Sequence, residues 1–122
     1  MTQEDKELLL KDLCARLPYN PLVEYKGESY NVLGIAHGRL VLCKPFMSYT
    51  LKENPLVEEV KTYLFPLSSM TEEQRNEYHE LLYDPIHGIN IDYFDWCHKN
   101  HLDCRGLIPK GLAIDATGLN IY

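Results

Sequence analysis

The hydrophobic positions near the start of the chain recur every three or four residues, which is the spacing of an amphipathic helix. Between Thr2 and Leu17, one face carries the apolar side chains Leu8, Leu9, Leu13, Cys14 and Leu17. The charged residues of this segment lie largely off that face: Glu4, Lys6, Lys11, Asp12 and Arg16. Thr2 and Asp5 have the spacing of a capping box, and Pro18 ends the pattern. We therefore predict a helix over residues 2–17 whose charged side faces away from the core.

The period changes to two after Pro21, where apolar and polar residues begin to alternate as in half-buried strands. Three runs rich in β-branched and aromatic residues are separated by the short Gly-containing turns at 26–28 and 37–38. These runs are Leu22–Tyr25, Ser29–Ala36 and Arg39–Cys43. Such spacing predicts an antiparallel β-meander. Gly34, inside the second run, marks a candidate bulge.

The second half of the chain predicts helices and short extended segments. Residues 45–55 form an irregular connection, and Leu56–Leu67 fits both helical and strand spacing, of which we prefer the strand. Two overlapping capping boxes, Ser69–Glu72 and Thr71–Gln74, open a helix over Ser68–Tyr83. Asn90 or Asp92 caps a short helix that ends near Asn100, and a last strand follows at 112–114 after the turn at 109–111. The predicted fold is a single α+β domain, residues 1–122, in which a small antiparallel β-meander packs with an N-terminal helix and two C-terminal helices.

Composition narrows the class of protein. The chain has 122 residues, of which 45% are hydrophobic and 25% charged, as in an ordinary globular domain. Its net charge of −6 argues against direct nucleic-acid binding, which needs a surplus of Lys and Arg. No window approaches the roughly 18 apolar residues of a membrane span. The acidic start also lacks the pattern of a signal peptide, so we expect a cytoplasmic protein whose four Cys are thiols.

The segment from Asp92 to Ala116 contains the only Trp and the densest candidate chemistry. Cys97, His101 and Cys104 form a C-x3-H-x2-C pattern, and if Cys97 and His101 shared one face of a helix the three could bind zinc. The fourth ligand would come from Cys14, Cys43, His37 or His98. The alternative is structural, with Cys97 packing as a small hydrophobic residue and His101 lying near a helix C-terminus.

Other side chains in this segment suggest weaker sites. A Cys–His nucleophile with Asp95 or Asp103 as the orienting group needs a geometry that spacing alone does not supply. Asp92, Asp95, Asp103 and Asp115 could form a carboxylate site, although Asp92 more simply caps a helix and Asp103 more simply initiates a turn. Common enzymatic motifs are absent from the sequence, so we predict no catalytic residue. Arg105 and Lys110 lie beside glycines and could bind an anion or a partner's carboxylate, or pair with Asp103 or Asp115.

Two motifs in the second half of the chain resemble a group of short uncharacterised proteins from gut Bacteroidetes genomes and their phage or mobile-element regions. The first is the SSMTE run that opens a helix, and the second is a DW…H-x-D-x-RGLI-x-KGLA ending. Cys97 and Cys104 lie outside the shared pattern. The matching residues are Ser68, Ser69, Met70, Thr71, Glu72, Asp95, Trp96, His101, Asp103, Arg105, Gly106, Leu107, Ile108, Lys110, Gly111, Leu112 and Ala113. The resemblance covers about half of the chain, implies no established activity, and suggests an accessory or host-interaction role.

Three hypotheses follow from these features. The first is a non-enzymatic protein-binding factor in which Trp96, Arg105 and Lys110 contact the partner, and in which Trp96 and Leu107–Ile108 anchor the last helix to the sheet. A basic host protein met by the acidic helices is one partner consistent with the net charge. The second is a zinc- or small-molecule-binding protein that uses Cys97, His101 and Cys104. The third is a phage structural or assembly component, for which a symmetric oligomer is expected.

Overall fold

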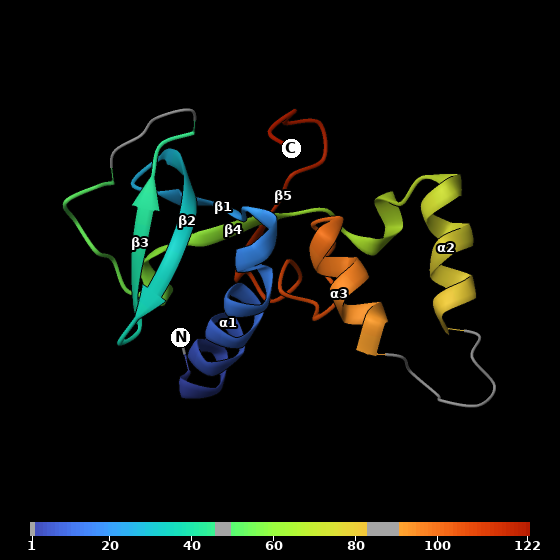
Figure 1. Cartoon of the computed structure of the whole chain (residues 1–122), viewed down its shortest axis with the longest axis horizontal. Coiled ribbons are helices and arrows are strands. Elements are labelled where there is room, and N and C mark those ends of the chain that lie inside the picture. Colours follow the sequence, from blue (N-terminus) through green and yellow to red (C-terminus); the bar gives the residue numbers. More distant parts are fainter. Residues whose placement is uncertain (1, 46–49, 83–90) are drawn as a thin grey trace.

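The computed structural model describes residues 2–45, 50–82 and 91–122, and within these ranges the predicted α+β class is confirmed (Figure 1). The α-helices are α1 (Gln3–Arg16), α2 (Glu72–Leu82) and α3 (Ile91–Lys99). The strands are β1 (Leu22–Tyr25), β2 (Glu28–Ala36), β3 (Arg39–Cys43), β4 (Lys61–Leu64) and β5 (Ala113–Asp115). They form one sheet in the order β3-β2-β1-β4-β5. No helix within the described ranges has the length and apolar character that a membrane span requires.

The predicted meander is present, and the sheet extends beyond it. β1, β2 and β3 pair antiparallel, with a register shift between Val32 and Gly34 where the bulge was expected. The preference for a strand within 56–67 is also confirmed, because β4 pairs antiparallel with β1 and lies between the 3₁₀ turns Val57–Glu59 and Leu67–Ser69. The last strand begins one residue later than predicted and pairs parallel with β4, so the sheet is mixed.

The helix boundaries depend on which capping residues the chain uses. In α1, the Asp5 N–H donates to Thr2 Oγ1 at 3.1 Å and the Thr2 N–H to Asp5 Oδ2 at 3.3 Å, which is the predicted capping box. In α2, the second of the two overlapping boxes is used, since Thr71 and Gln74 exchange hydrogen bonds of 3.2 and 3.0 Å. The predicted start at Ser68 was therefore wrong: α2 begins at Glu72.

The third helix begins at Ile91, so the alternative in which Asp92 caps it was wrong. Asp92 is the second residue of α3, whereas a cap residue lies outside the helix. Asn90, the other candidate cap, and Tyr83, the predicted end of α2, lie outside the described residues.

The charged side of α1 is buried in the second half of the helix, contrary to prediction. Asp12 is 1% exposed and Arg16 is fully buried, while Cys14, which was placed on the apolar face, is exposed. Leu9 and Leu13 pack into the main core against strand residues such as Val23 and Leu64. α3 and the segment that follows it lie on the other side of α1, so both sides of its last turns are covered (Figure 1).

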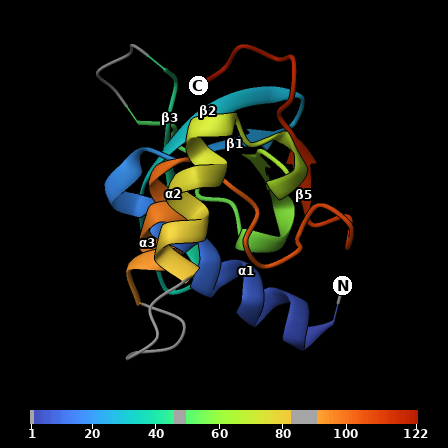
Figure 2. The same cartoon turned by 90° about the vertical axis from the view of Figure 1, so that its right-hand side faces the viewer.

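A second, smaller cluster joins α3 to α2 and to the segments beside them. α2 lies on the side of α3 away from α1 (Figures 1 and 2). The cluster is built on Tyr93, Cys97 and Leu102, and the Tyr78 ring meets Tyr93 edge-on at 5.6 Å. Trp96 Nε1 donates to Glu77 Oε2 at 2.8 Å, so this side chain joins α3 to α2 and does not anchor α3 to the sheet as predicted. Leu107 does enter the main core, with Ile108 packed against it.

The Tyr122 hydroxyl bridges β1 and β4 beyond the last residues that pair between them, Val23 and Thr62. It accepts from the Leu22 N–H at 3.0 Å and donates to the Tyr63 carbonyl at 2.9 Å. Burial of this hydroxyl raises the pKa of Tyr122 to about 12. The backbone groups of two diverging strands are thus satisfied by one side chain.

Candidate functional site

The segment after α3 folds back toward the sheet and brings the candidate residues to α1. His101 has a positive φ of 56°, and the Leu102 N–H donates to the Cys97 carbonyl at 2.8 Å. The Asp103 N–H then donates to the Phe65 carbonyl at 2.8 Å. The Asp103 carboxylate accepts the N–H groups of Leu107 and Ile108 at 2.8 and 2.9 Å, which confirms its predicted role in initiating a turn. This turn fixes the position of Arg105.

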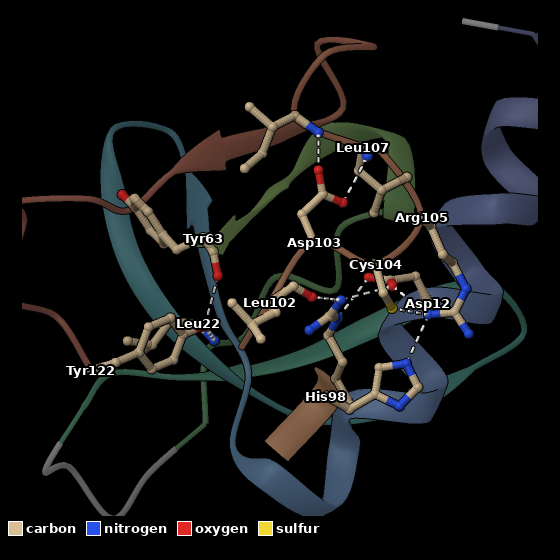
Figure 3. A network of polar contacts seen from close by, with 12 residues as sticks. Asp12, Leu22, Tyr63, His98, Leu102, Asp103, Cys104, Arg105, Leu107 and Tyr122 are labelled. Atoms are coloured by element: carbon tan, nitrogen blue, oxygen red, sulfur yellow. Dashed lines mark hydrogen bonds and ion pairs between the residues drawn. The ribbon is translucent and has the colours of Figure 1, made fainter. Parts of the chain in front are cut away.

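Asp12, Arg16 and Arg105 form a buried charge network (Figure 3). Arg16 Nε and Nη2 donate to the two Asp12 carboxylate oxygens at 2.8 and 3.1 Å, and Nη2 also donates to the Leu102 carbonyl at 2.7 Å. Arg105 Nη1 donates to Asp12 Oδ1 at 2.8 Å. The predicted pairing of Arg105 with Asp103 or Asp115 was therefore wrong, because its carboxylate partner comes from α1. Two guanidinium groups share one carboxylate, which leaves a local excess of positive charge.

His98 extends this network toward the thiols. It is 4% exposed, and its Nε2 lies 2.7 Å from Arg105 Nη1 (Figure 3). A guanidinium can only donate, so Nε2 accepts this hydrogen bond and carries no proton. Arg105 Nη1 also lies 3.8 Å from Cys104 Sγ. One nitrogen of Arg105 therefore contacts a carboxylate, an imidazole and a sulfur atom.

Cys104 packs against the cluster that contains Cys97. Cys97 is fully buried, whereas Cys104 is partly exposed. A hydrogen bond from the Cys97 thiol, assisted by His98 and by the charges of Arg16 and Arg105, holds the pKa of Cys104 well below its usual value. The same hydrogen bond, together with burial, raises the pKa of Cys97. The surroundings of Cys104 therefore favour its thiolate form, and those of Cys97 favour the neutral thiol.

The structure places His101 apart from these two sulfur atoms. Its ring stacks on Tyr122 with 3.6 Å between centroids, since α3 ends at Lys99 and the positive φ of His101 redirects its side chain. Among the described residues, no group of three or more His, Cys, Asp or Glu side chains is arranged to hold a metal ion. Of the four candidate fourth ligands, His98 is the one that reaches Cys104, while Cys14 is exposed on α1, Cys43 lies on β3 and His37 lies in the turn before β3.

Of the predicted carboxylates, Asp95, Asp103 and Asp115 are held separately. Asp95 accepts from the Tyr19 hydroxyl at 2.6 Å, and Asp115 accepts from the Thr117 N–H at 2.9 Å. Neither contact involves Asp103, whose carboxylate holds the turn at 107–108. These contacts give each of the three carboxylates a separate structural role.

An open hollow of about 530 Å³ lies beside the charge network, between α1, α3 and the segment around Arg105. Lys11, Arg105 and Lys110 supply three cations to its wall, and Cys104 reaches it as well. Its apolar wall comes from Leu8 and from Phe94, whose ring lies 5.2 Å from the Arg105 guanidinium carbon and is 39% exposed. Two of the three predicted partner-binding residues therefore meet at one hollow, and the third, Trp96, lies against α2.

Sequence reasoning missed Asp12 and Arg16 as members of the site. Their i,i+4 spacing on a helix is a signal for an ion pair, but that spacing is equally common on exposed helix surfaces. Their partners Leu102 and Arg105 are 86 and 93 residues away in the chain. The cations Arg105 and Lys110 were recognised from the sequence, but Lys11, the third cation that lines the hollow, was not.

Comparisons of this chain with protein-family models, with curated proteins and with solved structures find no match. We therefore infer the function from the geometry of the site.

The His101 ring provides a test of the folded arrangement by pH. Burial, assisted by the charge of Arg16, lowers the pKa of His101 from 6.5 to about 4. The unfolded chain therefore binds a proton that the folded chain does not, and we expect the free energy of unfolding to fall as the pH is lowered from 6.5 toward 4. Denaturant unfolding across this range should show a smaller loss in His101→Asn, a replacement that tolerates positive φ. Equal losses in both proteins would contradict this account.

Proposed function

We propose that this chain is a non-enzymatic accessory protein of the cytoplasm that binds another protein, and that an acidic segment of the partner occupies the hollow beside Arg105. The observation that carries the proposal is the gathering of Lys11, Arg105 and Lys110 around one hollow in a chain with a net charge of −6. The mobile-element resemblance supports a host-interaction role for such a protein. Local cations on an acidic surface give selectivity, because the rest of the surface repels an acidic partner that is not docked there.

Arg105 is suited to recognise a carboxylate. Its hydrogen bonds to other described residues all run through Nη1, so within this part of the chain Nε and Nη2 remain for a ligand. Asp12 and His98 hold the guanidinium in place, which lowers the entropy lost when it binds. A bidentate contact with a carboxylate uses two such nitrogens in a fixed plane. Lys11 and Lys110 then add charge at the rim.

The apolar wall of the hollow adds a preference for what lies beside the acidic group. Phe94 and Leu8 face the same hollow as the three cations. An apolar side chain next to the acidic residue would cover the exposed Phe94 ring and gain about 25 cal/mol for each Å² of apolar surface that is buried. The expected ligand is therefore a peptide segment with a carboxylate and a neighbouring apolar residue.

A defined peptide assay tests this proposal. We expect a displayed library of short peptides, selected on the immobilised protein, to enrich sequences in which Asp or Glu adjoins an apolar residue. By fluorescence anisotropy, their affinity should fall about tenfold in Lys110→Glu, since a reversed rim charge repels the carboxylate. Lys52→Glu is the matched control, because Lys52 is exposed and does not line the hollow. Selection of no acidic peptide, or an equal loss in both variants, would overturn the proposal.

A further inference from the structure

The thiols of Cys97 and Cys104 differ in their access to solvent and in their surroundings. Cys97, in the last turn of α3, is fully buried, and Cys104, on the returning segment, lines the hollow of about 530 Å³. The backbone holds them close, since the Leu102 N–H donates to the Cys97 carbonyl at 2.8 Å and the Cys104 N–H to the Leu102 carbonyl at 3.1 Å. A reagent that enters the hollow from solvent therefore meets Cys104 first, because Cys104 lines the hollow and Cys97 is buried in the cluster against which Cys104 packs.

We propose that Cys104 and Cys97 form a peroxide-sensitive thiol pair, in which Cys104 is oxidised first and Cys97 completes a disulfide. The reaction does not need the proposed partner, because it requires only a small hydroperoxide that enters the hollow while no partner segment occupies it. Nothing in the reaction requires a metal or a bound cofactor.

The reaction has two steps. The Cys104 thiolate attacks the terminal hydroxyl oxygen of the hydroperoxide, the O–O bond breaks, and the other oxygen leaves as hydroxide or alkoxide, which takes a proton from solvent to become water or an alcohol. Cys104 is then a sulfenic acid. The Cys97 sulfur attacks the Cys104 sulfur, the S–O bond breaks, and the hydroxyl leaves as water with the proton of Cys97. The two thiols lose two electrons, which reduce the peroxide.

The charges that face Cys104 favour attack by this sulfur. Arg105 Nη1 lies 3.8 Å from its Sγ, and His98 contacts it from α3. Asp12 neutralises only one of the two guanidiniums that it contacts, so the surroundings of Cys104 keep a positive excess. The Lys side chains at the same hollow add to this excess and favour the thiolate. The groups that face the pair are Lys11, Asp12 and Arg16 from α1, Tyr93, Cys97 and His98 from α3, and Arg105 and Lys110 from the segment after α3.

Treatment of the reduced protein with hydrogen peroxide, followed by mass spectrometry, tests the proposal. We expect the mass to fall by that of two hydrogen atoms, peptide mapping to find a Cys97–Cys104 disulfide, and dithiothreitol to reverse the change. In Cys97→Ser the reaction should stop at the Cys104 sulfenic acid, which a dimedone-type probe traps. Cys14→Ser is the matched control, since Cys14 is an exposed thiol on α1 outside this cluster, and it should leave the disulfide unchanged.

Two results would overturn the proposal. One is oxidation of Cys14 before Cys104 in the wild-type chain, which would mean that the cluster gives Cys104 no advantage over an ordinary exposed thiol. The other is a native mass raised by one zinc ion that protects both Cys97 and Cys104 from peroxide, which would make the pair a metal site. Both measurements use the wild-type chain, so they hold even if a serine variant fails to fold.

Discussion

Asp12→Asn is expected to lower the free energy of unfolding by about 3–5 kcal/mol, the cost of removing one member of a buried ion pair. The Asp12 carboxylate is 1% exposed and is bound by both Arg16 and Arg105. Asn keeps the size of the side chain but removes its charge, so the fully buried Arg16 guanidinium loses its compensating carboxylate. Urea or guanidinium chloride unfolding followed by circular dichroism measures the loss.

Glu7→Gln is the matched control for this change. It removes a carboxylate from the exposed part of the same helix, where surface substitutions usually alter stability by no more than about 0.5 kcal/mol. A loss below about 1 kcal/mol in Asp12→Asn would show that Asp12 does not compensate the two guanidiniums. A loss of the expected size is a large part of the roughly 5–15 kcal/mol by which domains are stable.

The local parts of the fold could be predicted from the sequence because their causes are local. The turns around Gly27 and Gly38 separate strands in which apolar and polar residues alternate from one position to the next. The antiparallel pairing of β1, β2 and β3 follows from these turns. The capping boxes at Thr2 and Thr71 likewise depend on residues three positions apart. Where two capping boxes overlapped, residue spacing did not decide which one begins α2. The Ser69 hydroxyl of the first box donates to the Pro66 carbonyl, so it does not cap α2.

The candidate site could be predicted only in part because it is assembled from distant segments. A helix that continued through residue 101 would have placed Cys97 and His101 on one face, but α3 ends at Lys99 and His101 takes a positive φ. The proximity of Cys104 to Cys97 depends on this reversal of the chain, which helical i,i+4 spacing does not predict. The burial of Asp12 and Arg16 depends likewise on a segment about 90 residues further along the chain, as the separations of 86 and 93 residues show.

Asp103→Ala is expected to lower the free energy of unfolding by about 3 kcal/mol or more. The carboxylate of Asp103 is 6% exposed and accepts the N–H groups of Leu107 and Ile108 at 2.8 and 2.9 Å. Hydrogen bonds to a charged group contribute about 1.5–3 kcal/mol each, and Ala leaves both N–H groups without their acceptor. Asp103→Asn should lose less, because its single amide oxygen can still accept one of them. Denaturant unfolding measures the stability, and hydrogen exchange reports on the two amides.

Asp115→Asn is the control, since Asp115 also accepts a nearby backbone N–H, that of Thr117 at 2.9 Å, but on an exposed surface. We expect a loss below about 1 kcal/mol there, because water replaces the lost acceptor. Asp103 also fixes the turn between Arg105 and Lys110, so Asp103→Ala should weaken binding of the selected acidic peptides even under conditions in which the variant stays folded. Unchanged exchange at Leu107 and Ile108 would contradict the assignment, and unchanged peptide affinity would separate the turn from the hollow.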